Sequence, residues 1–191
     1  MNFEIFARDY ISRLNKLLNN MDISSLNEFY NILFNIKNGS TIYIIGNGGS
    51  SATASHMAND LAVGLKIREI KNLKVISLSD NSSVNFAISN DIGFENVFYM
   101  QLKNILNPDD LIIAISCSGN SFNIVKAVEY AKEQKCKIVG LTGFDGGKLK
   151  VLSDISIHFE TNKGEYGLVE DAHSIINHLI FTYFKTKRIN I

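Results

Sequence analysis

Five short, almost uninterrupted apolar runs recur along the chain, each bounded by polar or glycine-rich residues. Strands that are buried on both faces of a parallel sheet read in this way, whereas a half-buried strand alternates polar and apolar residues. Strands are therefore predicted at 41–45, 75–78, 111–115, 137–142 and 155–159.

Between and around these runs, apolar residues recur three and four positions apart, which is the spacing of a helix face. This pattern predicts helices over about 51–65, 82–90, 94–105, 121–134 and 168–186, and a loop at 145–147. Alternating strands and helices favour a parallel sheet with right-handed crossovers. The predicted fold class is α/β, a three-layer α-β-α sandwich around a mainly parallel sheet.

A helical pair precedes the first strand and a long helix closes the chain. The pair occupies about 3–36, with a turn near Asp22, and both it and the helix at 168–186 carry apolar stripes. We therefore expect one domain, 1–191, with an N-terminal helical extension over about 1–38. The apolar stripes need further surface to cover them, either on the same domain or on another subunit, and we expect a homo-oligomer.

Two glycine- and serine-rich turns directly follow two of the predicted strands. They are 46–51 (GNGGSS) and 116–121 (SCSGNS), and a helix is predicted after each. Open α/β sheets bind ligands at the carboxyl ends of their strands. Glycines allow close approach to backbone N–H groups, serines add hydroxyl donors, and helix N-termini favour anions. The paired turns predict a site for a phosphorylated or polyhydroxylated small molecule.

Charge and composition narrow the function classes. Among 191 residues, Lys plus Arg and Asp plus Glu both total 19, so the formal net charge is zero and no broad nucleic-acid surface is expected. No apolar stretch has the length of a membrane span, and the first ten residues lack a signal-peptide core. Two cysteines, Cys117 and Cys136, form no disulfide framework, so a reducing cytoplasm is the expected compartment.

Histidines and carboxylates share faces on two of the predicted helices. His56 and Asp60 are four residues apart, and Glu170 and His178 are eight apart, with His173 between them. Such faces could converge on one divalent metal ion. The His56–Asp60 spacing is more often that of a solvated surface pair, and His173, off the His178 face, suits a structural or interface role.

Five segments, in this order and spacing, resemble the sugar isomerase (SIS) domain family, and within it the phosphoheptose isomerases. The resemblance spans about 40–185. It rests on GNGGS at 46–50 followed by His56, SNDIGFE at 89–95, ISCSGNS at 115–121, LTGFDGG at 141–147, and the pattern EDxHxxxxH at 170–178.

The resemblance implies an aldose–ketose isomerase that converts sedoheptulose 7-phosphate to D-glycero-D-manno-heptose 7-phosphate through an enediol, as a precursor of surface polysaccharide. It implies a homotetramer with one zinc per subunit. Asp60 and His178 fall on the acid–base positions, and the metal positions are His56, Asp60, Glu170 and His178. The implied substrate-binding residues are Asn47, Gly48, Gly49, Ser50, Asp60, Asn90, Asp91, Ser116, Cys117, Ser118, Ser121 and Glu170.

Three positions depart from the family pattern. Asp60 stands where the family has Glu, Glu170 where it has Gln, and Gly64 where it has Arg. A carboxylate that is one methylene shorter changes the reach of the acid–base group, and a misplacement of roughly 1 Å can cost about a hundredfold in rate. The alternative hypothesis is therefore a non-enzymatic SIS-domain protein that binds a replication initiator or senses a sugar phosphate.

Overall fold

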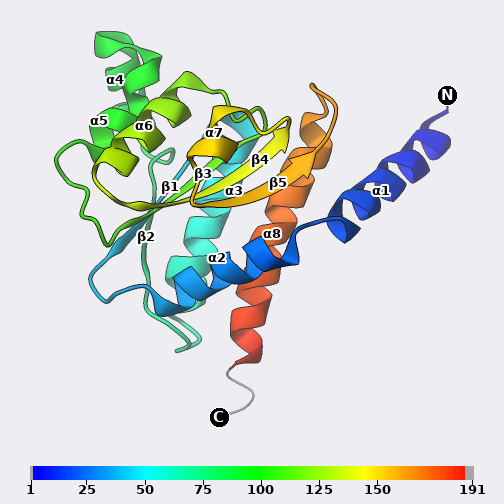
Figure 1. Ribbon diagram of the computed structural model, residues 1–191, viewed down its shortest axis with the longest axis horizontal. Coiled ribbons are helices and arrows are strands. Elements are labelled where there is room, and N and C mark those ends of the chain that lie inside the picture. The colour runs from blue at the N-terminus through cyan, green and yellow to red at the C-terminus, as the bar shows by residue number, and fades with distance from the viewer. Residues whose placement is uncertain (1, 188–191) are drawn as a thin grey trace.

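The computed structural model describes residues 2–187 and confirms the three-layer α-β-α fold (Figure 1). The elements in chain order are α1 Phe3–Asn19, α2 Ile23–Asn35, β1 Thr41–Gly46, α3 Gly48–Asn59, the π-helical turn η1 Asp60–Gly64, β2 Lys74–Ser77, α4 Ser82–Ile92, the 3₁₀ turn η2 Phe94–Asn96, α5 Val97–Leu102, β3 Leu111–Ser116, α6 Phe122–Glu133, β4 Lys137–Phe144, α7 Gly147–Leu152, β5 Ile155–Glu160 and α8 Tyr166–Thr186.

The five strands form one sheet in the order β2-β1-β3-β4-β5, and every neighbouring pair is parallel. All residues of β1 and β3 are buried, as their continuous apolar sequence predicts. The direction of the strand order reverses between β1 and β3. In this strand order that switch point is where an open α/β sheet leaves a ligand crevice.

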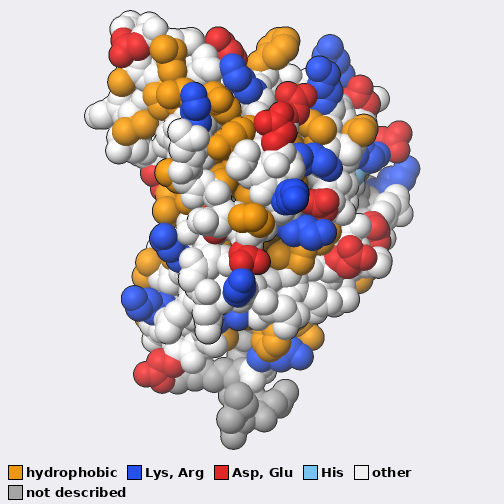
Figure 2. Space-filling model, turned by 60° about the vertical axis from the view of Figure 1, so that its left-hand side comes forward, with side chains coloured by type: hydrophobic (Ala, Val, Ile, Leu, Met, Phe, Trp, Pro, Cys, Tyr) orange, Lys and Arg blue, Asp and Glu red, His pale blue; other side chains and the backbone are white. Residues whose placement is uncertain are grey.

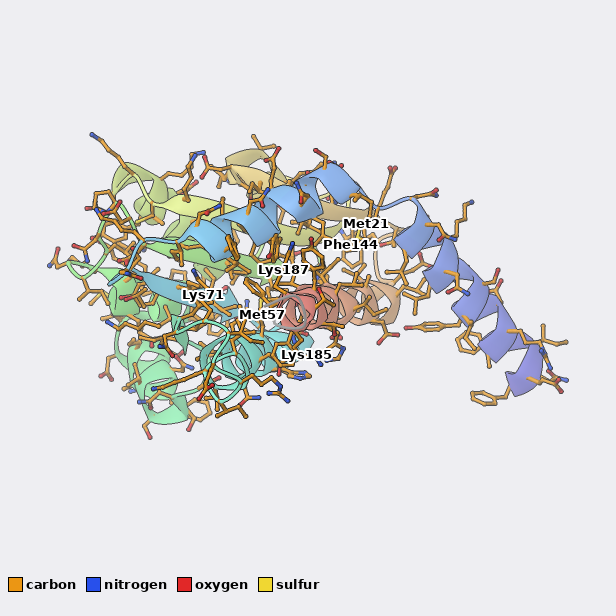
Figure 3. All side chains as sticks on the ribbon, turned by 90° about the horizontal axis from the view of Figure 1, so that it is seen from below. Met21, Met57, Lys71, Phe144, Lys185 and Lys187 are labelled. Atoms are coloured by element: carbon orange, nitrogen blue, oxygen red, sulfur yellow. The ribbon has the colours of Figure 1, made fainter. Side chains whose placement is uncertain are left out.

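The two faces of the sheet carry separate hydrophobic cores. Helices α2, α3 and α8 cover one face, where residues such as Phe29, Met57 and Ile176 pack on alternate strand residues. Helices α5, α6 and α7 cover the other face through residues such as Phe98 and Val128. Helices α3 and α8 lie side by side, with Met57 of α3 beside α8 in Figure 3.

The N-terminal helical pair divides into two helices with different roles. Asp22 caps α2 by accepting a hydrogen bond from the Ser24 N–H, and α2 contributes Phe29, Tyr30 and Leu33 to the core. Helix α1 has no buried residue and extends away from the rest of the molecule in Figure 1. Leu14, Leu17 and Leu18 of α1 pack in part against the core, whereas Phe3, Ile5, Phe6 and Ile11 stay exposed.

Two local features differ from the sequence prediction. The segment after the loop at 145–146 forms the short helix α7, because Leu149 is fully buried against the core. The helix predicted over 51–65 begins at Gly48, and its last turn is π-helical, with the Leu65 N–H bonded to the Asp60 carbonyl at 3.0 Å. π-Turns of this kind often occur at functional sites.

None of the helices within residues 2–187 is both long and apolar enough to cross a membrane.

Candidate functional site

The two glycine- and serine-rich turns lie next to each other, because β1 and β3 are neighbours in the sheet. They border a cavity of about 150 Å³ at the carboxyl ends of these strands, lined by Asn47, Ser50, Ile115, Ser116, Cys117, Ser118, Ser121, Tyr166 and Glu170. We call this cavity the serine-turn pocket. A larger hollow of about 800 Å³ lies between α1 and β5, among residues of neither turn.

Two helices begin at the serine-turn pocket without a side-chain hydrogen bond from the N-cap residue. Helix α3 starts after Asn47 and α6 after Ser121, and neither of these residues caps its helix with a side-chain hydrogen bond. The first N–H groups of a helix lack partners inside the helix and carry its positive partial charge. Two such ends that converge on serine hydroxyls make a binding site for an anion.

Contacts within the second turn, 116–121, stabilise its conformation. The Gly119 N–H donates to the Ser116 Oγ at 3.1 Å, and the Ser116 and Ser121 hydroxyls lie 3.4 Å apart. Gly119 has a φ of 61°, and a Cβ on it would collide with the Gly146 carbonyl. Glycine is therefore required at this point for the turn to pack on the loop before α7.

Asn123 is a site residue that the sequence analysis missed. It lies on the first turn of α6 with only 1% of its surface exposed, and its side-chain amide exchanges two hydrogen bonds of 2.9 Å with the Asn47 amide. The sequence does contain a signal for Asn123: it is an amide side chain two residues after the turn 116–121, on the buried side of the helix that follows. The pair holds the two turns together.

Glu170 lies in the serine-turn pocket, against the start of α3. A Cβ on Gly49 would overlap the Glu170 carboxylate, so the glycine makes room for this side chain. The nearby negative charge of Glu170, together with burial as the larger cause, raises the pKa of the Cys117 thiol to about 11. The pocket thus holds an acidic side chain where an anion would bind.

Helices α3 and α8 bring His56, Asp60 and His178 together. One possible ligand atom from each lies within 4.8 Å of the others, and the two imidazole rings meet edge to face with centroids 5.0 Å apart. Both histidines are exposed, whereas Asp60 is only 8% exposed. Among the residues described, Glu170 does not join this group. Its role as a fourth metal ligand stays a prediction.

The three-residue group fits a first-row divalent cation. Imidazole nitrogens and a carboxylate oxygen are the donors such ions prefer, and a catalytic zinc site keeps three protein ligands and one open position. Exposed histidines around a buried carboxylate leave that open position facing solvent. The hypothesis of a solvated His56–Asp60 pair does not account for His178, which comes from another helix.

Two other predicted site residues lie apart from both clusters. Asn90 and Asp91 lie on the last turn of α4, exposed, with the Asn90 amide donating to the Asp91 carboxylate at 2.9 Å. Neither residue lines the serine-turn pocket. Their role in substrate binding stays a prediction.

The remaining histidines, His173 and His158, lie on either side of Thr142. His173 is fully buried, and its Nε2 is 3.3 Å from the Thr142 carbonyl oxygen, while the His158 Nδ1 is 3.0 Å from the Thr142 Oγ1. Burial, the largest cause, lowers the pKa of His173 to about 4. His173 is therefore a neutral core residue near neutral pH, directed away from the His56 group.

Comparison with known proteins places this fold and site in a family. A family model described as the SIS domain matches residues 7–143. The phosphoheptose isomerase of Helicobacter hepaticus is 41% identical over 149 residues, 78% of this chain and 74% of that protein. The probable phosphoheptose isomerase of Thermoplasma volcanium is 35% identical over 173 residues, 90% of this chain and 87% of that protein.

Solved structures agree with the sequence relatives. The phosphoheptose isomerase of Neisseria gonorrhoeae superposes with a TM-score of 0.82 at 26% identity, and the match covers 96% of both chains. The chain therefore belongs to the SIS domain family and, within it, to the phosphoheptose isomerases.

Proposed function

We propose that this protein interconverts sedoheptulose 7-phosphate and D-glycero-D-manno-heptose 7-phosphate, a heptose precursor of surface polysaccharide. The names of its curated relatives support the proposal. One observation carries it: the serine-turn pocket and the His56–Asp60–His178 group lie along the same two helices. Six residues of helix separate Ser50 from His56, about 9 Å along the axis. An open-chain seven-carbon sugar phosphate has a comparable length.

In this proposal the phosphate binds in the serine-turn pocket. Ser116, Cys117, Ser118 and Ser121 would supply hydroxyl and backbone N–H donors, helped by the amides at the starts of α3 and α6. The sugar hydroxyls would then extend along α3 toward His56. Residues proposed to hold these hydroxyls are Asn47, Gly48, Gly49, Ser50, Asn90, Asp91 and Glu170.

The isomerisation moves two protons. In the ketose-to-aldose direction, a base removes the C1 proton while the C2 carbonyl oxygen gains a proton, which gives the enediol. The enediol then gains a proton at C2 and loses one from the C1 hydroxyl. We assign these transfers to Asp60 and His178, whose possible ligand atoms lie within 4.8 Å of each other.

The same group would hold zinc, one ion per subunit. His56, Asp60 and His178 supply the donors, and Glu170 is the proposed fourth ligand. A bound zinc ion would polarise the substrate carbonyl and favour the charge that develops on its oxygen. Asp60 is only 8% exposed, so its carboxylate lies on the buried side of the group, next to the two exposed histidines.

We further propose a homotetramer. Phe3, Ile5, Phe6 and Ile11 of α1 are each at least 50% exposed, so this helix needs a partner surface. A second exposed apolar set, Phe86, Ile92, Phe94 and Phe122, accompanies the hydrophobic side chains gathered at the end of the molecule where α4 lies (Figure 2). Light scattering on the purified protein tests the assembly. A monomer at micromolar concentration would refute it.

The cytoplasm is the proposed compartment. Both cysteines are free and buried, and cysteines persist unpaired in a reducing environment.

The direct test is incubation with sedoheptulose 7-phosphate, with and without zinc, followed by NMR detection of the aldose. Asp60→Ala and His178→Ala should each lose at least a hundredfold in kcat. Ser174→Ala is a control for α3–α8 packing, because it removes the Thr53–Ser174 hydroxyl contact between the two helices and changes none of the proposed acid–base, metal or substrate-binding residues. It should retain turnover.

Unchanged turnover in both the Asp60 and the His178 variants would refute the assignment of the acid–base pair. A folded wild-type protein that binds the sugar phosphate without converting it would refute the isomerase and favour the binding or sensing alternative.

A further inference from the structure

Asn177 connects the core of α8 to the metal-binding group. It precedes His178 in sequence, is only 2% exposed, and its Nδ2 donates a hydrogen bond of 2.8 Å to the Asp60 Oδ2. The same Asp60 oxygen lies 3.4 Å from the His56 Nε2. A single buried amide thus contacts the carboxylate that faces both histidines.

An amide at this position is costly for the core. Its neighbours Ile176 and Ile180 belong to the main hydrophobic cluster, and a buried polar group costs free energy unless it is hydrogen-bonded. Within residues 2–187 the Asn177 Oδ1 is buried without a hydrogen-bond partner. The bond to Asp60 is therefore the contact that explains an amide here.

The backbone brings α8 close enough for this bond. Asp60 and Gly64 are the two ends of the π-turn, and Asn177 and Phe181 have the same spacing on α8. A Cβ on Gly64 would lie 2.9 Å from the Phe181 ring, so the absent side chain lets α8 pack directly on the turn. Asp60–Asn177 and Gly64–Phe181 are thus two parallel contacts across one interface.

We propose that Asn177 is a positioning residue for Asp60. The short aspartate does not set its own orientation as a longer glutamate would, and the amide restrains one carboxylate oxygen so that the group stays directed at His56 and His178. This inference rests on the role that the proposed function gives Asp60. The proposal explains two departures from the family pattern. Asp60 is oriented by the Asn177 amide, and Gly64 lets α8 pack close enough for that hydrogen bond to form.

The test compares Asn177→Leu, which has the same branched heavy-atom skeleton but lacks the donor, with Asn177→Ala and the control Ser174→Ala. Zinc affinity is measured by chelator competition, and the visible spectrum of the Co²⁺-loaded protein reports ligand geometry. Loss of a residue that orients a metal ligand typically weakens metal binding about 10- to 100-fold. We expect this loss, an altered Co²⁺ spectrum, and a similar fall in kcat with KM within threefold.

A rescue variant separates orientation from packing. In the double variant Asp60→Glu with Asn177→Leu, the longer acid no longer needs the amide, so zinc affinity should recover at least threefold over Asn177→Leu alone. Zinc affinity and kcat within twofold of wild type in both Asn177 variants would overturn the proposal. An equal loss in Ser174→Ala would also overturn it, because general α3–α8 packing would then be the cause.

The metal measurements need no sugar, so they distinguish the two proposals. A wild-type protein that binds zinc but converts no substrate refutes the proposed function and still tests Asn177. A wild-type protein that neither binds metal nor converts the sugar refutes both.

Discussion

The Asn47 and Asn123 side chains exchange two hydrogen bonds of 2.9 Å, and this amide pair joins the turn after β1 to the helix that follows β3. Each amide uses one donor and one acceptor on the other, which leaves Asn47 a second donor and a second lone pair toward the serine-turn pocket. The amide pair therefore joins the two turns that border the serine-turn pocket.

Replacing Asn123 by leucine should weaken substrate binding and stability together. The substitution leaves the part-buried Asn47 amide without its partner, which costs about 1–3 kcal/mol. We expect a loss of that size in urea unfolding and a rise in KM. Asn27→Ala, at an exposed position of α2, is the control and should change neither. An unchanged KM in a destabilised Asn123→Leu protein would show that the pair serves folding only.

Glu170→Gln should raise affinity for the phosphorylated sugar. The carboxylate lies in the serine-turn pocket, and removing a negative charge near a bound phosphate should lower KM about 3- to 10-fold. Zinc affinity should fall, because the proposed fourth ligand changes from a carboxylate to a neutral amide, which attracts a cation less strongly.

Glu165→Gln is the matched control, since Glu165 begins the same helix but pairs with Arg13 outside the pocket. Unchanged zinc affinity in Glu170→Gln would contradict the proposal that Glu170 is the fourth metal ligand.

His173 should make stability depend on pH in the acidic range. Its pKa is about 4 in the folded chain and about 6.5 in the unfolded chain, so only the unfolded state binds the proton between these values. This contribution to folding is complete above pH 6.5 and is lost as the pH falls toward 4, in total about 3 kcal/mol. Unfolding in urea at pH 7.5 and 4.5 measures the loss.

His173→Leu should reduce that difference between the two pH values, whatever its effect on overall stability. An identical pH dependence in the variant and the wild type would contradict the assignment.

Cys117 should be unreactive despite its place in the serine-turn pocket. Burial and Glu170 raise the pKa of its thiol to about 11, so at pH 8 the thiolate fraction is about a hundredfold below that of an ordinary cysteine. Alkylation by iodoacetamide, followed by mass spectrometry, should be correspondingly slow until the protein unfolds. Cys117→Thr should keep kcat within threefold. Rapid labelling with loss of turnover would contradict this prediction.

Much of the architecture follows from local pattern. The runs at 41–45 and 111–115 read as strands because both of their faces are buried, and helical spacing alone places His56 and Asp60 on one face. Local pattern did not predict helix α7, because its six residues begin at a glycine and carry little periodic signal. Burial of Leu149 in the core stabilises this helix.

The site itself depends on how the elements pack. Spacing placed Glu170 and His178 on one helical face, but eight residues span about 12 Å, so one lies in the serine-turn pocket and the other beside His56. The position of α8 along the axis of α3 decides which part of α3 lies next to Glu170 and which part lies next to His178.

By itself, the sequence determined the strands, the helices other than α7 and the chemistry of the two turns, because hydrophobic periodicity and turn residues act over a few neighbouring positions. Tertiary structure alone decided that Asn123 pairs with Asn47 and that Asn177 meets Asp60. Each of these contacts joins residues 76 or 117 positions apart, and close packing such as that of Phe181 on Gly64 sets their distance.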